Sequence, residues 1–221
     1  MYLKEHTIRG LHGFLDSILK RYALRGGRAI DLGAGSGALA VRLRELGFEV
    51  IVVDVSNERF KADIPFVQMN LNNPIPCSLE DRGFDFVTAV EVIEHLESPI
   101  AFLRYVRSLL KPDGIALVTT PNMDSAPSRF RFLLTGKLHM MDEKVPNHIS
   151  PIFYDLFIRQ YLPQAGLKLV EHLLFPMKGY KVSRKRYSWV FHLLARLLPG
   201  NNLFGDVNVF LLKAIDDDDA K

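Results

Sequence analysis

Short apolar runs and helical apolar patterns alternate along most of the chain. Almost wholly apolar runs predict buried strands over residues 28–32, 48–53, 66–69, 84–90, 115–119, 167–174 and 207–214. Apolar residues recur at helical spacing over residues 11–22, 38–47, 92–110 and 152–165. Because strands that alternate with helices form parallel sheets with right-handed crossovers, the pattern predicts an α/β fold. We expect a doubly wound sheet with helices on both faces and ligands at the carboxyl ends of its strands.

Composition narrows the class of protein. The single cysteine, Cys77, excludes an intrachain disulfide framework, and no cluster of Cys and His has zinc-like spacing. The polar N-terminus holds no run of signal-peptide type, and no stretch approaches the roughly 20 apolar residues that span a bilayer. We therefore expect a cytoplasmic protein that is soluble or peripheral at a membrane.

A glycine-rich segment, DLGAGSG, begins at Asp31, where the first predicted strand ends. Its glycines allow a sharp turn and a close approach of backbone to a ligand, and the next helix offers free N–H groups. Gly33, Gly35 and Ala38 also fit the dinucleotide pattern G-x-G-x-x-A. Asp31 argues against that ligand class, because its carboxylate would repel a pyrophosphate but could pair with a ligand ammonium group. Asp54 ends the second predicted strand and could accept hydrogen bonds from two ribose hydroxyls, which suits both ligand classes.

Four motifs occur in an order that resembles class I S-adenosylmethionine-dependent methyltransferases: DLGAGSG, Asp54, FDFVTAVEVIEHL and LKPDGIALVTTPN. The resemblance extends over residues 28–122 and implies a Rossmann-like, mostly parallel sheet of seven strands with an antiparallel last strand. It implies S-adenosylmethionine as cofactor, with the glycines at its methionine moiety, Asp54 at its ribose and Asn70-Leu71 at its adenine. Many relatives have Asp at the position of Asn70. The implied cofactor contacts are Asp31, Gly33, Ala34, Gly35, Gly37, Asp54, Val55, Asn70, Leu71 and Glu91.

The segment EVIEH, from Glu91 to His95, lies where a predicted strand meets a predicted helix, beside the expected position of the transferred methyl group. For a hydroxyl acceptor the protein must align the attack and help to remove a proton. His95 is the candidate base because histidine titrates near neutral pH, and Glu94 is a second catalytic candidate.

Metal binding is another role for this segment. E-x-x-E-H resembles the magnesium-binding segment of ubiquinone-pathway O-methyltransferases and of small-RNA 2′-O-methyltransferases, which add a later histidine. Glu91, Glu94, His95 and His148 could therefore hold a divalent cation. The carboxylates suit Mg²⁺, whereas two imidazoles favour manganese, iron or zinc. Alternatively, Glu91 contacts the cofactor, and Glu94 and His95 only orient the start of the helix.

One methyltransferase domain is expected to span residues 1–215, since 48% hydrophobic residues in a chain of 221 can supply one core. Its expected parts are an N-terminal helix (1–27), a cofactor-binding half (28–122), a lid or insertion (123–150) and a basic amphipathic insertion (178–206). Residues 216–221 are expected to be an acidic disordered tail, without which the formal net charge rises from +3 to +6.

The acceptor is suggested by the basic run KGYKVSRKR at 178–186 and the amphipathic stretch at 187–198. They predict peripheral contact with anionic lipid and a lipid-linked or small-molecule acceptor. Packing of this stretch on the domain and binding of nucleic acid are the alternatives. The function expected is methyl transfer to a hydroxyl of a small molecule, lipid intermediate or glycan. An RNA 2′-O-methyltransferase or a non-catalytic nucleotide-binding protein of this fold would also fit.

Overall fold

The computed structural model describes residues 3–5, 7–22, 26–74, 79, 83–143, 145–181 and 202–215. Two sequence predictions fall outside these ranges. They are the acidic tail at 216–221 and residues 182–201 of the basic amphipathic insertion, which include most of the predicted lipid-binding stretch.

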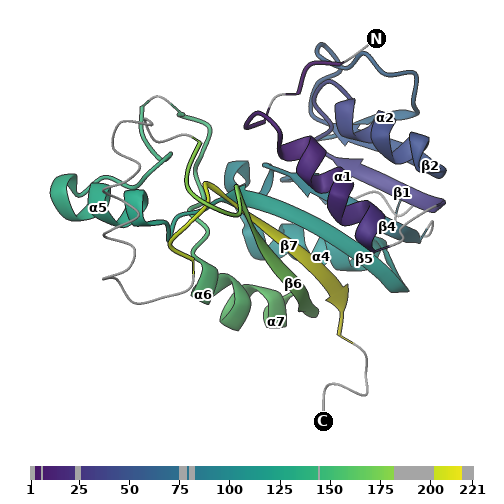
Figure 1. Cartoon of the computed structure of the whole chain (residues 1–221). Helices are drawn as coiled ribbons and strands as arrows, with labels where there is room; N and C mark the ends of the chain where they lie inside the picture. Colours follow the sequence, from purple (N-terminus) through teal and green to yellow (C-terminus); the bar gives the residue numbers. More distant parts are fainter. Residues whose placement is uncertain are drawn as a thin grey trace.

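A seven-stranded sheet forms the centre of the protein, with strand order β3-β2-β1-β4-β5-β7-β6 (Figure 1). β7 is antiparallel to both β5 and β6, while the pairs formed among β1 to β5 are all parallel. The predicted Rossmann-like sheet with an antiparallel last strand is therefore confirmed. The strands are β1 (Gly27–Leu32), β2 (Phe48–Asp54), β3 (Phe66–Gln68), β4 (Phe84–Val90), β5 (Leu110–Pro121), β6 (Leu167–Phe175) and β7 (Val207–Ala214).

Helices cover both faces of the sheet and produce two apolar layers (Figure 1). On one face, α1 (Leu11–Arg21) and α2 (Ala38–Glu45) bury Leu15 and Leu43 against the sheet. On the other face, α4 (Pro99–Leu109) and the helical stretch 154–164 bury Phe102 and Phe157. That stretch is one continuous run made of α6 (Tyr154–Leu156), the π-helical η2 (Phe157–Tyr161) and α7 (Leu162–Gln164). Because both faces are covered, the central strands are mostly apolar and buried, as the sequence pattern indicated.

The predicted helix over 92–110 is wrong in its first part. The chain forms a short 3-10 helix, η1 (Ile93–His95), then an extended residue at Leu96, and α4 begins only at Pro99. Ser98 caps α4, since its hydroxyl accepts a hydrogen bond from the Ala101 amide, and proline suits the first helical position. The break separates the EVIEH segment from α4.

The predicted lid, 123–150, contains a helix that its sequence pattern did not reveal. α5 (Ala126–Thr135) is capped by Ser125 and projects away from the sheet (Figure 1). The chain then returns to η1, where the Ile149 and Ser150 amides donate to the Glu94 carbonyl. No helix within the described ranges is long and apolar enough to cross a membrane.

The strand order reverses between β1 and β4, which lie side by side at the centre of the sheet. Such a reversal leaves a crevice at the carboxyl ends of the strands. The glycine-rich loop, Asp54 and the EVIEH segment follow β1, β2 and β4, so the topology brings all three to this crevice.

Candidate functional site

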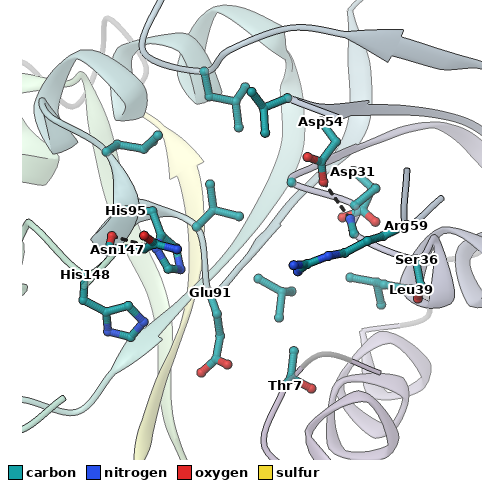
Figure 2. A pocket seen from close by; sticks show the side chains of 18 of the residues that line it. Thr7, Asp31, Ser36, Leu39, Asp54, Arg59, Glu91, His95, Asn147 and His148 are labelled. Atoms are coloured by element: carbon teal, nitrogen blue, oxygen red, sulfur yellow. Dashed lines mark hydrogen bonds between the residues drawn. The ribbon is translucent and has the colours of Figure 1, made fainter. Parts of the chain in front are cut away.

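A cavity of about 950 Å³ opens at the carboxyl ends of β1, β2 and β4 (Figure 2). The predicted site residues that line it are Asp31, Gly33, Ala34, Gly35, Asp54, Val55, Asn70, Leu71, Glu91, His95 and His148. Two predicted residues, Gly37 and Glu94, do not line it.

The glycine-rich loop is fixed to the end of β2. The Gly35 amide donates to Asp54 Oδ2 at 2.8 Å, and the Gly33 amide donates to the Val53 carbonyl at 2.7 Å. A side chain at position 33 would come within 2.4 Å of Val92 Cγ2, whereas one at position 35 would meet nothing within 4 Å. Gly33 therefore allows close packing of the loop, and Gly35 leaves open space on the cavity side.

Gly37 packs closely against the loop after β2. A Cβ at this position would lie 2.7 Å from Ala62 and 2.8 Å from Phe60. Gly37 also precedes α2 with a φ of 84°, a conformation that favours glycine. It thus lets the loop after β2 pack against the start of α2.

Asp31 is a buried carboxyl at the floor of the cavity, only 2% exposed. The Thr88 hydroxyl donates to Asp31 Oδ1 at 2.6 Å. Burial raises the pKa of Asp31 to about 7, the nearby charge of Asp54 raises it further, and the Thr88 hydrogen bond opposes the rise. A cationic group bound beside Asp31 would therefore favour its ionised form.

Glu91 enters the cavity from the end of β4 (Figure 2). Its φ of 55° is rare for a residue with a side chain, and its amide donates to Thr119 Oγ1 at 3.0 Å. Oε1 is buried without a hydrogen-bond partner among the described residues, and burial raises the pKa of Glu91 to about 7. Strained backbone and an unsatisfied buried acid are features of ligand sites.

Two histidines face each other at the other end of the cavity (Figure 2). The rings of His95 and His148 meet edge to face, with centroids 4.6 Å apart. His95 Nδ1 lies 2.9 Å from the Asn147 carbonyl, which can only accept, so Nδ1 carries a proton and Nε2 holds the lone pair of the neutral ring. Burial and the charge of His95 lower the pKa of His148, which favours its neutral form.

Glu94 lies behind the cavity wall and is 1% exposed. Neither carboxylate oxygen makes a hydrogen bond of ordinary geometry to a described residue, although Thr120 is close enough to oppose the shift of its pKa. Burial, followed by the charge of Glu91, raises the pKa of Glu94 well above its usual range. One ligand atom from each of Glu94, His95 and His148 lies within 4.8 Å of the others. The donor set therefore fits a divalent cation, but Glu91 is outside the cluster that was predicted to include it.

Some lining residues have no signal in the sequence. Thr7, Ile8 and His12 come from the segment before and at the start of α1, and Arg59 comes from the loop after β2. Their contribution depends on how distant segments fold over the glycine loop, which local patterns do not encode.

Comparison with known proteins gives the family. Residues 4–172 match the family described as a methyltransferase domain. The chain is a member of the S-adenosylmethionine-dependent methyltransferases, enzyme class 2.1.1. The methyltransferase is 32% identical over 130 residues to a ubiquinone biosynthesis O-methyltransferase of Xanthomonas campestris, covering 55% of this chain and 54% of that protein. It is 29% identical over 179 residues to a ubiquinone biosynthesis O-methyltransferase of Roseobacter denitrificans, and the match covers 75% of this chain and 67% of that protein. This methyltransferase thus matches about half the length of the first of these relatives.

Solved structures show that the methyltransferase shares its fold with distant proteins. The YcgJ protein of Bacillus subtilis has a TM-score of 0.62 at 17% identity and covers 93% of this chain and 100% of that one. An N1-methyltransferase of Burkholderia thailandensis with bound S-adenosylhomocysteine has a TM-score of 0.59 at 16% identity, covering 95% and 80%. At these identities the likeness concerns the fold alone.

Proposed function

We propose that this methyltransferase transfers a methyl group from S-adenosylmethionine to a hydroxyl of a small molecule, a lipid intermediate or a glycan. The observation that carries the proposal is one continuous cavity. It joins the glycine loop and Asp54 at one end to the free Nε2 of His95 at the other. Cofactor and acceptor can therefore meet within it.

The charges and hydrogen-bonding atoms at one end of the cavity support binding of the cofactor there. The Asp31 carboxylate pairs with the ammonium group of the methionine moiety, and Asp54 accepts from the ribose hydroxyls. Asn70 and Leu71 face the adenine. Asn70 Oδ1 accepts a hydrogen bond from the Asn72 backbone amide at 3.0 Å, which leaves the side-chain NH₂ group of Asn70 to donate to the base.

The chemical step requires alignment and one proton transfer. The acceptor oxygen attacks the methyl carbon, the bond from carbon to sulfur breaks, and S-adenosylhomocysteine is released. The proton of the acceptor hydroxyl passes to Nε2 of His95, whose Nδ1 proton is held by the Asn147 carbonyl. The sulfonium supplies the activated methyl group, so the protein contributes position and this base.

The acceptor class is supported by two observations. The relatives named above are ubiquinone biosynthesis O-methyltransferases, which favours a hydroxylated acceptor. Met140, Pro146 and Ile149 of the predicted lid line the cavity beside His148, and they add apolar surface suited to a hydrophobic acceptor. RNA and peripheral lipid contact stay alternatives to be tested with the acceptor panel.

The proposal is tested by methyl transfer from labelled S-adenosylmethionine to a panel of catechols, hydroxylated lipids, glycans and short RNAs, each paired with an amine analogue. Transfer to a hydroxyl member, lost when the hydroxyl is absent, supports it. Transfer only to amines would contradict the choice of oxygen. Binding of the cofactor without any transfer would favour the non-catalytic alternative.

The pKa of Asp31 predicts the pH dependence of cofactor binding. The bound ammonium group requires ionised Asp31, so the protein must lose this proton on binding. With a pKa of about 7, affinity for S-adenosylmethionine should rise about eightfold from pH 6 to pH 7.5 in calorimetric titrations. Asp31→Asn should bind more weakly and lose this slope. Because Glu91 titrates in the same range, a slope that persists in Asp31→Asn would assign it to another group.

Substitutions of Gly33 and Gly35 are expected to affect different properties, stability in the first case and cofactor affinity in the second. Gly35→Ala places a methyl group in the open space of the cavity and should weaken S-adenosylmethionine binding, while its backbone strain costs about 1–2 kcal/mol of stability. Gly33→Ala collides with Val92 and should lower the melting temperature more. Thermal melts and titrations of both variants check this. Unchanged affinity in Gly35→Ala would show that the ligand does not approach the loop.

As an alternative role for His95, we propose that its Nε2 holds a divalent cation together with Glu94 and His148, because the ligand atoms of the three residues cluster and Glu94 has no ordinary hydrogen bond. Nε2 would then be a ligand and would not act as the base. Such a cation would lower the pKa of an acceptor hydroxyl. In that case the purified protein should bind Mn²⁺ or Mg²⁺ by calorimetry, and His148→Ala should not. Methyl transfer should fall with chelator and recover with added cation. Activity that is indifferent to chelator would contradict this role.

A further inference from the structure

The turn that carries His95 is too short to hold its own position. η1 is a single 3-10 turn of three residues, Ile93–His95, and no side chain of a described residue caps its start. The chain is already extended at Leu96. A first helical turn fixes several backbone dihedrals for very few hydrogen bonds and is unfavourable alone. The place of His95 in the cavity therefore depends on bonds from outside the turn.

The end of the predicted lid supplies three such bonds. The Ile149 and Ser150 amides donate to the Glu94 carbonyl at 2.9 and 3.0 Å. The Ser150 hydroxyl donates to the Leu96 carbonyl at 2.6 Å, in a partly buried position. One serine thus bonds to the backbone on both sides of His95. Ser150 does not itself line the cavity.

A loop at the cofactor end of the cavity, residues 70–73, bonds to the residue that follows Leu96. The Glu97 amide donates to Asn72 Oδ1 at 2.9 Å. Asn72 lines the cavity, and its own amide donates to Asn70 Oδ1 at 3.0 Å. Asn70 is the residue proposed to face the adenine. Two hydrogen bonds in series therefore connect the adenine end of the cavity to the chain just after η1.

These bonds matter because the His95 ring must point in one direction. Its Nδ1 bonds to the Asn147 carbonyl, as Figure 2 shows, and Nε2 is left for the reaction. Both roles proposed for Nε2, base and cation ligand, require a fixed ring. A displacement of about 1 Å in a reacting group can lower a rate about 100-fold. Groups that fix residues 94–97 can therefore act on the rate of methyl transfer through the position of His95.

We propose that Ser150 and Asn72 are positioning residues that hold residues 94–97, and with them His95, between the predicted lid and the loop 70–73. The proposal rests on the proposed function, since it takes His95 as the reactive group. Ser150 acts from outside the cavity wall. Asn72 links occupancy of the adenine end to the same segment. Loss of either side-chain bond lets the imidazole move while the cofactor still binds.

The experiment measures methyl transfer and amide hydrogen exchange on the full chain. Ser150→Ala removes the hydroxyl and Ser150→Thr keeps one, while Asn72→Ala removes the acceptor of the Glu97 amide and Asn72→Asp keeps it. Ser17→Ala is the matched control, because the hydroxyl of this exposed serine in α1 also donates to a backbone carbonyl at 2.6 Å, that of Phe14. Transfer is assayed with the hydroxylated acceptor found in the panel above. Exchange over residues 93–97 is followed by mass spectrometry with and without S-adenosylhomocysteine.

Ser150→Ala should lower kcat about 10- to 100-fold, the scale of a misplaced reacting group. The KM for the acceptor and the Kd for S-adenosylhomocysteine should change little, exchange over residues 93–97 should become faster, and Ser150→Thr should recover most of the rate. Ser17→Ala should change none of these quantities. An unchanged kcat in Ser150→Ala, or a cofactor affinity that falls as much as kcat does, would overturn the role of Ser150.

The exchange data test the link through Asn72 without any acceptor. S-adenosylhomocysteine should slow exchange over residues 93–97 in the unaltered chain and in Asn72→Asp, and clearly less in Asn72→Ala. Equal protection in Asn72→Ala would overturn the role of Asn72. If the unaltered chain bound the nucleoside but methylated no hydroxyl, the proposed function would fail, and exchange would still decide whether Ser150 and Asn72 hold this segment.

Discussion

Replacing His95 by glutamine is expected to lower kcat for a hydroxylated acceptor by about 10²–10⁴-fold, the range for loss of a general base. A glutamine amide can still donate to the Asn147 carbonyl, as His95 Nδ1 does, so η1 should keep its conformation. It cannot accept a proton at the position of Nε2. The affinity for S-adenosylhomocysteine should therefore change little, and the loss should fall on the chemical step.

Two further histidine variants show whether a loss of kcat in His95→Gln comes from loss of the base. His172→Gln removes an imidazole that bonds to Asn208 Oδ1 and does not line the cavity, so it should keep full activity. His148→Gln alters the neighbouring ring, and a loss as large as that of His95→Gln would favour a metal-linked role for both. The remaining activity of His95→Gln should rise with pH as the acceptor hydroxyl ionises without a base. A variant with normal kcat would remove His95 from the mechanism.

The fold was predictable because the central strands are mostly apolar and carry polar residues at or just after their carboxyl ends. Asp31 and Asp54 lie at these ends of β1 and β2, so parallel pairing alone places them together. The start of α4 was also encoded locally, since Ser98-Pro99 is a capping signal, but the apolar spacing across 92–110 hid it. The apolar periodicity of the sequence therefore predicted the positions of the strands better than the ends of the helices.

The parts that sequence reasoning missed depend on contacts between distant segments. Glu91 was expected at the cofactor and lines the cavity, but nothing in the EVIEH motif indicates the positive φ of its backbone. Gly37 belonged to the glycine motif, yet Phe60 and Ala62 make it a packing residue. Thr7 reaches the cavity only because Ser36 and Arg42 anchor the segment before α1. Motifs thus identified most of the predicted residues that line the cavity, but not the residues added by the segment before α1 or the packing of Gly37.

Asp54→Ala is expected to weaken S-adenosylmethionine binding by about 10²–10⁴-fold. Two hydrogen bonds from ribose hydroxyls to a carboxylate contribute roughly 1.5–3 kcal/mol each, and every 1.4 kcal/mol is tenfold in Kd. The variant also removes the acceptor of the Gly35 amide, so part of the loss comes from a looser glycine loop. Calorimetric titration measures the loss, and the melting temperature of the ligand-free variant measures the loosening.

Asp54→Asn separates these two contributions because its amide oxygen can still accept from the Gly35 amide. We expect Asp54→Asn to keep the melting temperature of the unaltered chain while binding S-adenosylmethionine more weakly, since a neutral acceptor forms weaker hydrogen bonds to hydroxyls. Asp113→Ala is the control, because this exposed aspartate lies in β5 before the strand's central run, far from the carboxyl ends of β1 and β2. It should change neither quantity. Full affinity in both Asp54 variants would mean that the ribose lies elsewhere, and the cavity would then need a ligand that does not use the end of β2.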